Sequence, residues 1–287
     1  MTSRNIAIQG IAGCYHDAAA RQYFSLHHPD DTITTLPCDS FVEMMERLDC
    51  DPSLIGIMAI ENTIAGALLQ NHELLRKSQL TIVGEHKMRI SHMLAALPGQ
   101  SIDDITEVRS HPMALMQCEQ FLRHFPSMRM IESFDTAGSA RTIAEEKLAG
   151  IAAVCGRYAA QLYGLEILKE NIETNKRNFT RFLILADPLV ASELKPRDEL
   201  LDKASVVFTL PHTQGALSKI LTILSFYDIN LSKIQSMPII GREWEYRFYL
   251  DVTFDSYARY LKAIEAVRPL LSDFKTLGEY RQCTNEY

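Results

Sequence analysis

The sequence predicts a mixed α/β protein built from two parts that are organised differently. Up to about residue 186, short apolar runs alternate with stretches of helical periodicity, which is typical of parallel βα units. Residues 187–202 are polar and charged and include two prolines, a composition typical of an interdomain linker. From residue 203 the order of elements becomes βαββαβ, the ferredoxin-like arrangement. We therefore expect domains at residues 1–186 and 203–287, joined by a linker at 187–202.

The elements of the first part follow from the spacing of apolar residues. We expect strands at residues 5–9, 32–36, 55–60, 80–85, 107–110, 128–133, 151–154 and 179–186. We expect helices at residues 14–24, 40–47, 63–77, 112–125, 136–148 and 158–162. The continuous apolar run from Phe182 to Leu185 indicates that the strand at 179–186 is buried on both faces.

The elements of the second part are expected in the order strand 204–210, helix 214–226, strand 229–236, strand 244–254, helix 257–271 and strand 275–282. A module of this size leaves a sheet edge and a sheet face open. Pairing with a second copy would cover them, so we expect a homodimer or a homotetramer.

The composition is that of a soluble globular protein. The chain has 287 residues, of which 47% are hydrophobic and 23% charged, so it is long enough for two domains with a substantial core. Its formal net charge of -7 and the lack of a Lys/Arg block argue against a nucleic-acid partner. We found no apolar stretch long enough for a secretion signal or a membrane span, so we expect a cytoplasmic protein with no membrane partner.

The six cysteines are scattered and form no Cys-x-x-Cys pair, and no histidine stands at metal-ligand spacing. This pattern predicts reduced thiols and no metal site.

Four junctions between a strand and the element after it carry residues suited to binding a small ligand. In open α/β sheets, ligands lie beyond the carboxyl ends of the strands, where helix N-termini present free N–H groups. The first junction is the glycine turn from Gly10 to Tyr15, which lacks the third glycine of a dinucleotide loop and the lysine of a phosphate loop. A nucleotide-dependent enzyme is therefore disfavoured. The other three junctions are Glu61-Asn62-Thr63, Ser110-His111-Pro112 and Asp135-Thr136-Ala137.

Each of these junctions also has a purely structural interpretation. Thr63 and Asp135 are good N-cap residues, and in isolation capping is the simpler interpretation of both. Pro112 fits the first position of a helix, which leaves Ser110 or His111 to cap it or to face a ligand. His111 is a candidate general acid, although a histidine at a helix start is more often a cap.

The run Asn178-Phe179-Thr180-Arg181-Phe182 places a hydroxyl beside a guanidinium at the start of the apolar strand. Together they suit holding a carboxylate and giving a proton to a leaving oxygen. Strict alternation along a strand would put Thr180 and Arg181 on opposite faces, so a shared site requires a bend there.

These motifs, in this order and spacing, resemble prephenate dehydratase with a C-terminal ACT regulatory domain. The resemblance covers nearly the whole chain and rests on five blocks in the first part. They are Ile60-Glu61-Asn62-Thr63 with Gly66, Ser110-His111-Pro112 with Ala114-Leu115 and Gln117-Cys118, Asp135-Thr136-Ala137, Tyr163-Gly164-Leu165, and Asn178 to Phe182. In the second part, Gly215-Ala216-Leu217 and the run from Asp228 to Ile234 resemble the amino-acid-binding ACT domain.

The resemblance implies a two-lobed catalytic domain, like a periplasmic binding protein, with the active site between the lobes. It implies decarboxylative dehydration of prephenate to phenylpyruvate without a cofactor. By analogy, Thr180 is the central catalytic residue and Arg181 grips a substrate carboxylate. The expected substrate-binding residues are Glu61, Asn62, Thr63, Ser110, His111, Asp135, Thr136, Asn178 and Phe182. Arogenate dehydratase and a non-catalytic amino-acid sensor stay open as alternatives.

The resemblance also implies inhibition by L-phenylalanine through the ACT domain. The expected effector-binding residues are Gly215, Ala216, Leu217, Asn230, Leu231, Gln235 and Ser236. Gln235 and Met237 stand where the family commonly has Glu and Arg, which bears on effector affinity. In the glycine turn and just after it, Cys14 and His16 stand where the family usually has Ser or Thr. Met113 replaces Gln in the Ser110-His111-Pro112 block, and Ser139 replaces Ala after Asp135-Thr136-Ala137.

Overall fold

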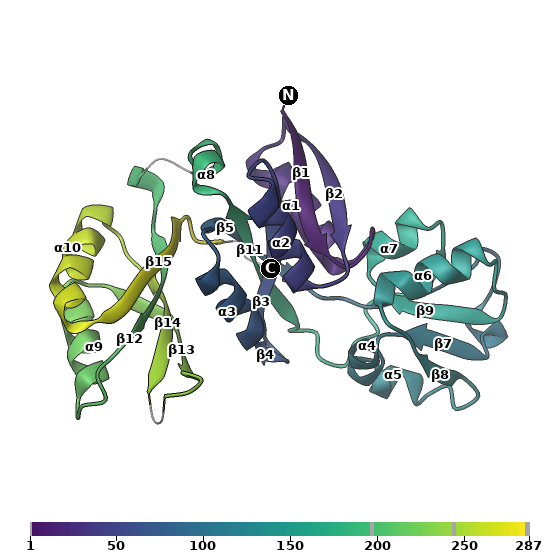
Figure 1. Cartoon of the computed structure of the whole chain (residues 1–287). Coiled ribbons are helices and arrows are strands. Elements are labelled where there is room, and N and C mark those ends of the chain that lie inside the picture. Colours follow the sequence, from purple (N-terminus) through teal and green to yellow (C-terminus); the bar gives the residue numbers. More distant parts are fainter. Residues whose placement is uncertain (1, 196–197, 243–244, 285–287) are drawn as a thin grey trace.

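The computed structural model describes residues 2–195, 198–242 and 245–284 and arranges them in two β-sheets (Figure 1). The larger sheet has the strand order β13-β14-β12-β15-β5-β11-β3-β1-β2, with β4 paired to β3. The smaller sheet has the order β10-β6-β9-β7-β8. The mixed α/β class and the two lobes expected from the sequence are confirmed.

The first lobe forms the centre of the molecule (Figure 1). Its strands are β1 (Ser3–Gln9), β2 (Thr32–Cys38), β3 (Ile55–Asn62), β4 (Gly66–Ala67), β5 (Thr81–Arg89) and β11 (Phe179–Ala186). Its helices are α1 (Tyr15–His27), α2 (Phe41–Cys50) and α3 (Leu69–Lys77). Strand β1 runs parallel to β2 and β3, whereas β11 runs antiparallel to both β3 and β5 because it returns from the second lobe.

The second lobe holds the smaller sheet. Its strands are β6 (Met93–Ala96), β7 (Glu107–Ser110), β8 (Arg129–Glu132), β9 (Ile151–Cys155) and β10 (Glu166–Lys169). Its helices are α4 (Pro112–Gln117), α5 (Glu119–Leu122), α6 (Thr136–Glu145) and α7 (Arg157–Leu162). The chain enters this lobe after β5 and leaves it before β11, so two crossing segments connect the lobes.

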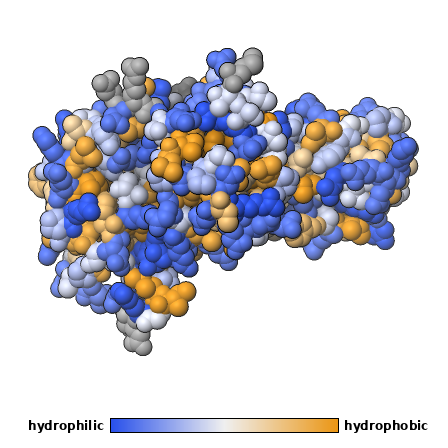
Figure 2. Space-filling model, turned by 45° about the horizontal axis from the view of Figure 1, so that its top comes forward, coloured by the Kyte–Doolittle hydropathy of each residue, from blue (hydrophilic) through white to orange (hydrophobic). Residues whose placement is uncertain are grey.

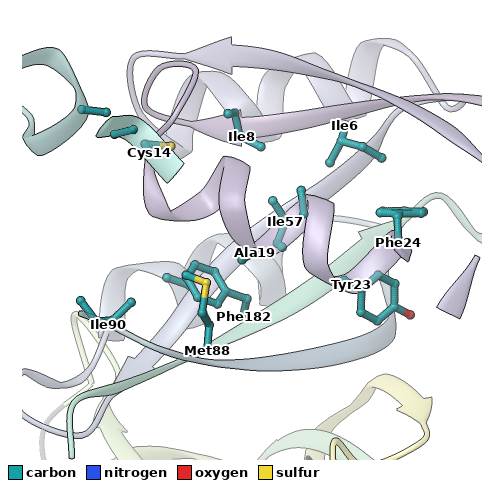
Figure 3. Packing of buried hydrophobic residues seen from close by; sticks show 14 of the residues in the cluster. Ile6, Ile8, Cys14, Ala19, Tyr23, Phe24, Ile57, Met88, Ile90 and Phe182 are labelled. Carbon is teal, nitrogen blue, oxygen red and sulfur yellow. The ribbon is translucent and has the colours of Figure 1, made fainter. Parts of the chain in front are cut away.

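Successive residues of β11 are buried in different cores. Phe182 packs with Ile57, Met88 and Ile90 in the core on the α1 side of the sheet (Figure 3). Leu183 packs on the other side, with residues of α2 and α3. The apolar run in β11 is therefore buried on both faces, as predicted.

The C-terminal module, residues 203–280, adds four strands to the same sheet. It comprises β12 (Lys203–Thr209), α9 (Ala216–Phe226), β13 (Asn230–Pro238), β14 (Tyr246–Thr253), α10 (Tyr257–Val267) and β15 (Ser272–Tyr280), the expected βαββαβ order. The two parts meet where Gly278 of β15 pairs with Ile82 of β5. A Cβ atom on Gly278 would lie 2.4 Å from the carbonyl oxygen of Ile82, so glycine is what allows this pairing.

Several expected elements differ from the observed ones. The helix expected at 63–77 begins only at Leu69, because the Asn62 side chain accepts the N–H groups of Ile64 and Ala65 and turns the chain into β4. The helix expected at 112–125 is interrupted at Cys118. Strands β6 and β10, each of four residues, were missed because such short segments show no clear period.

The expected linker contains a helix, α8 (Pro188–Leu194), which is capped by Asp187. Two of its residues, Ala191 and Leu194, are buried in the first-lobe core. The strands expected at 107–110 and 179–186 have the expected ends, and the other expected strands and helices are present with shifted ends. The first residue of the strand expected at 244–254 lies outside the described residues. The boundaries of the domains stay a prediction.

The surface in Figure 2 is largely hydrophilic with smaller hydrophobic patches. Phe226 and Ile240, both on the C-terminal module, are among the most exposed large apolar side chains. In the described part of the chain, no helix is long and apolar enough to span a membrane.

Replacing Gly278 tests the junction of the two parts. We expect Gly278→Ala to lower the free energy of unfolding by about 1–3 kcal/mol, because its methyl group meets backbone atoms of Ile82 that cannot rotate away. Gly138→Ala is the matched control, since its Cβ would lie no closer than 3.4 Å to a neighbouring atom. Urea titration of both variants measures the effect, and equal midpoints would contradict the close packing at Gly278.

Candidate active site

A cavity of about 640 Å³ lies between the two lobes. The first lobe lines it with His16, Asn62, Thr180 and Phe182, among others. The second lobe contributes side chains from the starts of α4 and α6, and the crossing segments contribute Ile90, His92 and Asn178. Seven of the expected site residues border this cleft: Asn62, His111, Asp135, Thr136, Asn178, Thr180 and Phe182.

The hydroxyl of Thr180 is oriented by Asn62. The Oδ1 atom of Asn62 accepts the backbone N–H groups of Ile64 and Ala65, both at 2.9 Å, so this atom must be the oxygen of the amide. The Nδ2 atom of Asn62 consequently faces Thr180 and donates to Oγ1 at 2.9 Å. Because Oγ1 accepts this bond, its own proton is left to point elsewhere, and no acceptor for it is found among the described residues.

The same amide starts a chain of hydrogen bonds along the cleft floor. Asn62 also donates to Asn178 Oδ1 at 2.7 Å, which turns the Asn178 Nδ2 atom towards Gln117 Oε1 at 3.0 Å. This oxygen lies 2.9 Å from His92 Nε2, so His92 must carry its proton on Nε2. The hydroxyl of Tyr15 lies 2.9 Å from both the His92 Nδ1 atom and the Ser91 carbonyl oxygen, and its one proton is shared between these two acceptors. Through Asn178 and His92, both crossing segments are thus hydrogen-bonded to residues of the two lobes at the cleft.

His16 faces the cleft as a neutral imidazole. Its Nε2 atom accepts the backbone N–H of Ala59 at 3.3 Å, which places the ring proton on Nδ1. Burial lowers the pKa of His16 to about 4, so the ring is uncharged near neutral pH. The ring is held edge-on against Phe41 and Phe182. The Nδ1–H group has no partner among the described residues, which makes it a donor for a ligand.

On the second lobe, two of the expected residues cap helices. His111 is the N-cap of α4, and its Nδ1 atom accepts the N–H of Met113 at 3.2 Å. Asp135 is the N-cap of α6, where Oδ1 accepts the N–H of Ala137 at 2.6 Å. Both side chains nevertheless border the cleft, together with Thr136.

Four expected site residues lie elsewhere. Ser110 is fully buried and donates to the Val154 carbonyl oxygen, because it sits inside the second-lobe sheet. Thr63 is exposed, and its hydroxyl accepts from the Phe179 N–H outside the cleft. Glu61 and Arg181 project from the opposite face of the first-lobe sheet.

The expectation that Arg181 grips a substrate carboxylate is therefore corrected. Its guanidinium is 5% exposed and is already bound to Glu85, Asp251 and Tyr280. The strand does bulge after Arg181, but this residue still alternates with Thr180. No bend brings the two side chains to one site.

Several residues that border the cleft were not predicted: Tyr15, His16, His92, Gln117 and Phe134. Tyr15 ends the glycine turn, His16 follows it, and Gln117 belongs to a recognised block, so position in the chain was an available signal for these three. His92 lies in a crossing segment without a predicted element, and Phe134 is a single aromatic residue in a loop. Nothing in the local sequence marked those two.

Burial keeps the cysteine of the cleft wall in its thiol form. Cys14 lies 3.5 Å from the carbonyl oxygen of Gln9. Burial raises its pKa to about 12, so little thiolate is present near neutral pH.

The expected effector-binding residues lie on the C-terminal module. Gly215 adopts a φ of 75° and forms the N-cap of α9, which begins with Ala216 and Leu217. Asn230, Leu231, Gln235 and Ser236 all lie on β13. Their role in binding an effector stays a prediction.

Comparison with known proteins identifies the family. Residues 6–189 match the family model described as prephenate dehydratase. A chloroplastic protein of Arabidopsis thaliana, arogenate dehydratase 5, is 36% identical over 294 residues, which cover 96% of this chain and 67% of the plant protein. This chain thus spans about two thirds of the length of that relative.

Two solved structures resemble the whole chain. One is described as a novel type of quorum-quenching acylase, with a TM-score of 0.83, 29% identity, and coverage of 98% of this chain and 99% of the other. The second is prephenate dehydratase from Arthrobacter aurescens in complex with L-Phe, with a TM-score of 0.82, 28% identity, and coverage of 97% and 90%. Given the family match over most of the chain, the protein belongs to the prephenate dehydratase family.

Proposed function

We propose that the protein is a prephenate dehydratase that converts prephenate to phenylpyruvate. The observation that carries this proposal is the hydrogen bond from Asn62 Nδ2 to Thr180 Oγ1. It leaves the Thr180 proton directed away from Asn62, on the side of the strand that borders the cleft.

In the reaction, the C–C bond to the ring carboxylate breaks and its electron pair enters the ring. The ring C–O bond breaks in turn, and the hydroxyl takes up a proton and leaves as water. If Thr180 supplies this proton, its Oγ1 atom regains one from solvent before the next turnover. The products are carbon dioxide, water and phenylpyruvate. Aromaticity supplies the driving force, so the enzyme's task is to assist the leaving oxygen.

Thr180 suits this task as an oriented donor. Its hydroxyl is a weak acid, but the N–H of Asn62 stabilises negative charge on Oγ1 as the proton moves to the leaving oxygen. Asn62 is in turn held by the two backbone N–H groups of the turn after β3, so the donor is positioned before substrate binds.

The charge of the cleft suits the loss of a carboxylate. Among the described residues that line it, none is Lys or Arg, and Asp135 is the one acidic side chain. A carboxylate held by neutral donors such as His16 Nδ1–H is bound less tightly in the ground state than one paired with arginine. When such a carboxylate leaves as neutral carbon dioxide, less binding energy is lost than if it had been paired with arginine.

Arogenate dehydratase is the second candidate, because Asp135 would favour the ammonium group of arogenate over the keto group of prephenate. The name of the Arabidopsis relative supports the same alternative. A non-catalytic sensor becomes the leading hypothesis if neither substrate is turned over. Burial keeps the thiol of Cys14 protonated, so this residue is not an activated nucleophile.

The C-terminal module is proposed to be an ACT domain that binds L-phenylalanine and pairs with a second copy. The βαββαβ order, the glycine turn before α9 and the L-Phe complex of the Arthrobacter relative support this proposal. A homodimer or homotetramer and a cytoplasmic location stay predictions.

Substitution of Thr180 tests the reaction. We expect Thr180→Val to lower kcat for prephenate by about a hundredfold to ten-thousandfold, because the variant keeps its shape but loses the donor. Thr180→Ser should retain most activity. Phenylpyruvate formation, followed by absorbance, measures both variants.

Thr63→Val is the matched control, because its hydroxyl lies outside the cleft. We expect less than about a tenfold loss for it. Asn62→Ala combined with Thr180→Val should be hardly worse than Thr180→Val alone, since the two residues act as a unit. Full activity of Thr180→Val would contradict the proposed mechanism.

Asp135→Asn tests the choice of substrate. Asparagine keeps the cap on α6 but removes the charge. If arogenate is the substrate, the ratio of kcat/KM for arogenate to that for prephenate should fall about tenfold. An unchanged ratio, with prephenate the faster substrate, would leave prephenate dehydratase as the assignment.

Titration with L-phenylalanine tests regulation. We expect saturating L-phenylalanine to reduce activity by about fivefold or more, while L-alanine leaves it unchanged. We expect Gln235 and Met237 to change the concentration of L-phenylalanine needed for inhibition, and not to abolish the inhibition. A flat response at saturation would exclude phenylalanine as the effector.

A further inference from the structure

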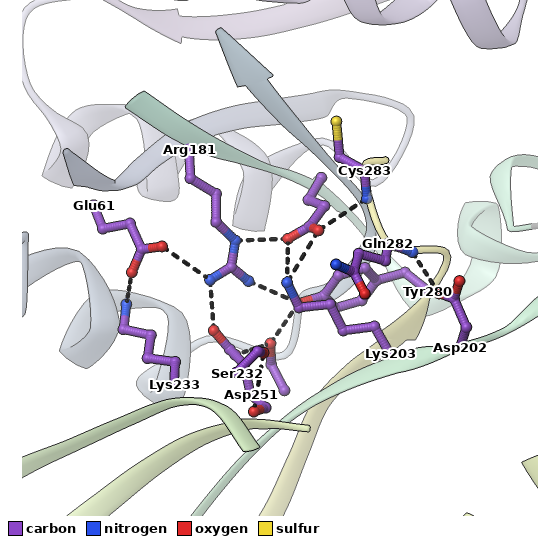
Figure 4. Close-up of polar contacts among 12 residues, drawn as sticks. Glu61, Arg181, Asp202, Lys203, Ser232, Lys233, Asp251, Tyr280, Gln282 and Cys283 are labelled. Atoms are coloured by element: carbon purple, nitrogen blue, oxygen red, sulfur yellow. Dashed lines mark hydrogen bonds and ion pairs between the residues drawn. The ribbon is translucent and has the colours of Figure 1, made fainter. Parts of the chain in front are cut away.

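A buried charged cluster joins the first-lobe sheet to the C-terminal module, with Arg181 at its centre (Figure 4). The Nε atom of Arg181 lies 2.6 Å from Glu85 Oε2. Its Nη1 atom lies 2.5 Å from Asp251 Oδ2, and its Nη2 atom donates to the Tyr280 hydroxyl at 2.9 Å. One residue of β11 is thus held by two strands of the module and one of its own lobe.

Two lysines of the module complete the cluster. Lys203 of β12 lies 2.9 Å from Glu85, and Lys233 of β13 lies 2.7 Å from Glu61 at the end of β3. Together with Arg181 and Asp251, these residues form a set of three cations and three anions. Every charge has an opposite partner, as a buried group of this kind requires.

The cluster favours the charged forms of Arg181 and of the three carboxylates, whereas burial lowers the pKa of Lys203. Burial raises the pKa of Asp251, but the Arg181 guanidinium outweighs this effect and holds the pKa at about 2. The neighbouring carboxylates keep Arg181 protonated in the same way, against the effect of burial. The ion pair between Arg181 and Asp251 therefore persists across the pH range of an enzyme assay.

The cluster and the candidate active site use neighbouring cross-strand pairs. In the pairing of β11 with β3, Thr180 lies opposite Asn62, and Arg181 lies opposite Glu61. Because side chains alternate along a strand, the first pair borders the cleft and the second pair enters the cluster. A displacement of the second pair would therefore move the first.

We propose that Arg181 is a positioning residue through which the docked C-terminal module sets the hydrogen bond between Asn62 and Thr180. Asp251 and Tyr280 of the module bind Arg181 of β11, the neighbour of Thr180. Lys233 of the module binds Glu61 of β3, the neighbour of Asn62. Strand β13 carries Lys233 together with four of the expected effector-binding residues. A movement of β13 would displace Glu61 and, with it, the neighbouring Asn62, which would change the hydrogen bond between Asn62 and Thr180. This inference rests on the proposed dehydratase function.

The test compares two ion pairs that both join the module to the first lobe. Asp251→Asn weakens the hold on Arg181. Arg247→Met removes the pair between Arg247 of β14 and Glu73 of α3, which is not part of β3 or β11. We expect Asp251→Asn to lower kcat for prephenate about tenfold or more with little change in KM, and Arg247→Met to change kcat less than about twofold.

Two further variants separate positioning from folding. Lys233→Met leaves Arg181 paired and should also lower kcat, because it removes the shorter of the two ion pairs that hold Glu61. Arg181→Lys should recover part of the activity lost in Arg181→Met, since it restores the charge without the fork of donors. Thermal unfolding of each variant gives the fraction of folded protein at the assay temperature. A loss of kcat larger than the loss of folded protein indicates a positioning effect.

Hydrogen–deuterium exchange gives a readout that does not depend on activity. Amides at residues 60–63 and 178–181 should exchange faster in Asp251→Asn and Lys233→Met than in Arg247→Met. Wild-type kcat and exchange rates in both folded cluster variants would overturn the positioning role. If the wild-type protein turns over no substrate, the proposed function fails, and the exchange comparison alone decides the positioning role.

Discussion

The alternation of side chains along β11 is the constraint on which the rest of the structure depends. Thr180 borders the cleft, whereas Arg181 enters the charged cluster shared with the C-terminal module. The strand lies between β3 and β5 in the middle of the larger sheet, so neither side chain can change face without breaking both pairings. The geometry of the cleft and the docking of the C-terminal module consequently both depend on this strand.

The polar groups of the cleft owe their directions to the backbone. Two backbone N–H groups identify the oxygen of Asn62, and this assignment passes through Asn178 and Gln117 to His92. A backbone N–H from Ala59 likewise determines which nitrogen of His16 carries a proton. Donors oriented in advance need little rearrangement when charge develops on a leaving group.

Among the described residues, the lining of the cleft includes no Lys or Arg side chain. Its arginine candidate is neutralised on the other side of the sheet, and the lining offers neutral donors beside apolar residues such as Ile90 and Phe182. Such a site is consistent with a reaction in which a carboxylate departs as neutral carbon dioxide. It also leaves Asp135 as the charge most able to distinguish a keto acid from an amino acid.

The sequence by itself determined the two-part α/β organisation, the βαββαβ order of the module and the choice of Asn62, Asn178 and Thr180 as candidates for one site. These features depend on local periodicity and on short motifs, which the order of residues contains directly. Only the tertiary structure decided that Arg181 and Glu61 face the module, that Ser110 is buried, and that His16 and His92 face the cleft. Those outcomes depend on which strand lies beside which, and Arg181 meets Asp251 across 70 residues of chain. No local sequence pattern predicts such a contact, because it forms only when two regions of the sheet that are far apart in the sequence pack side by side.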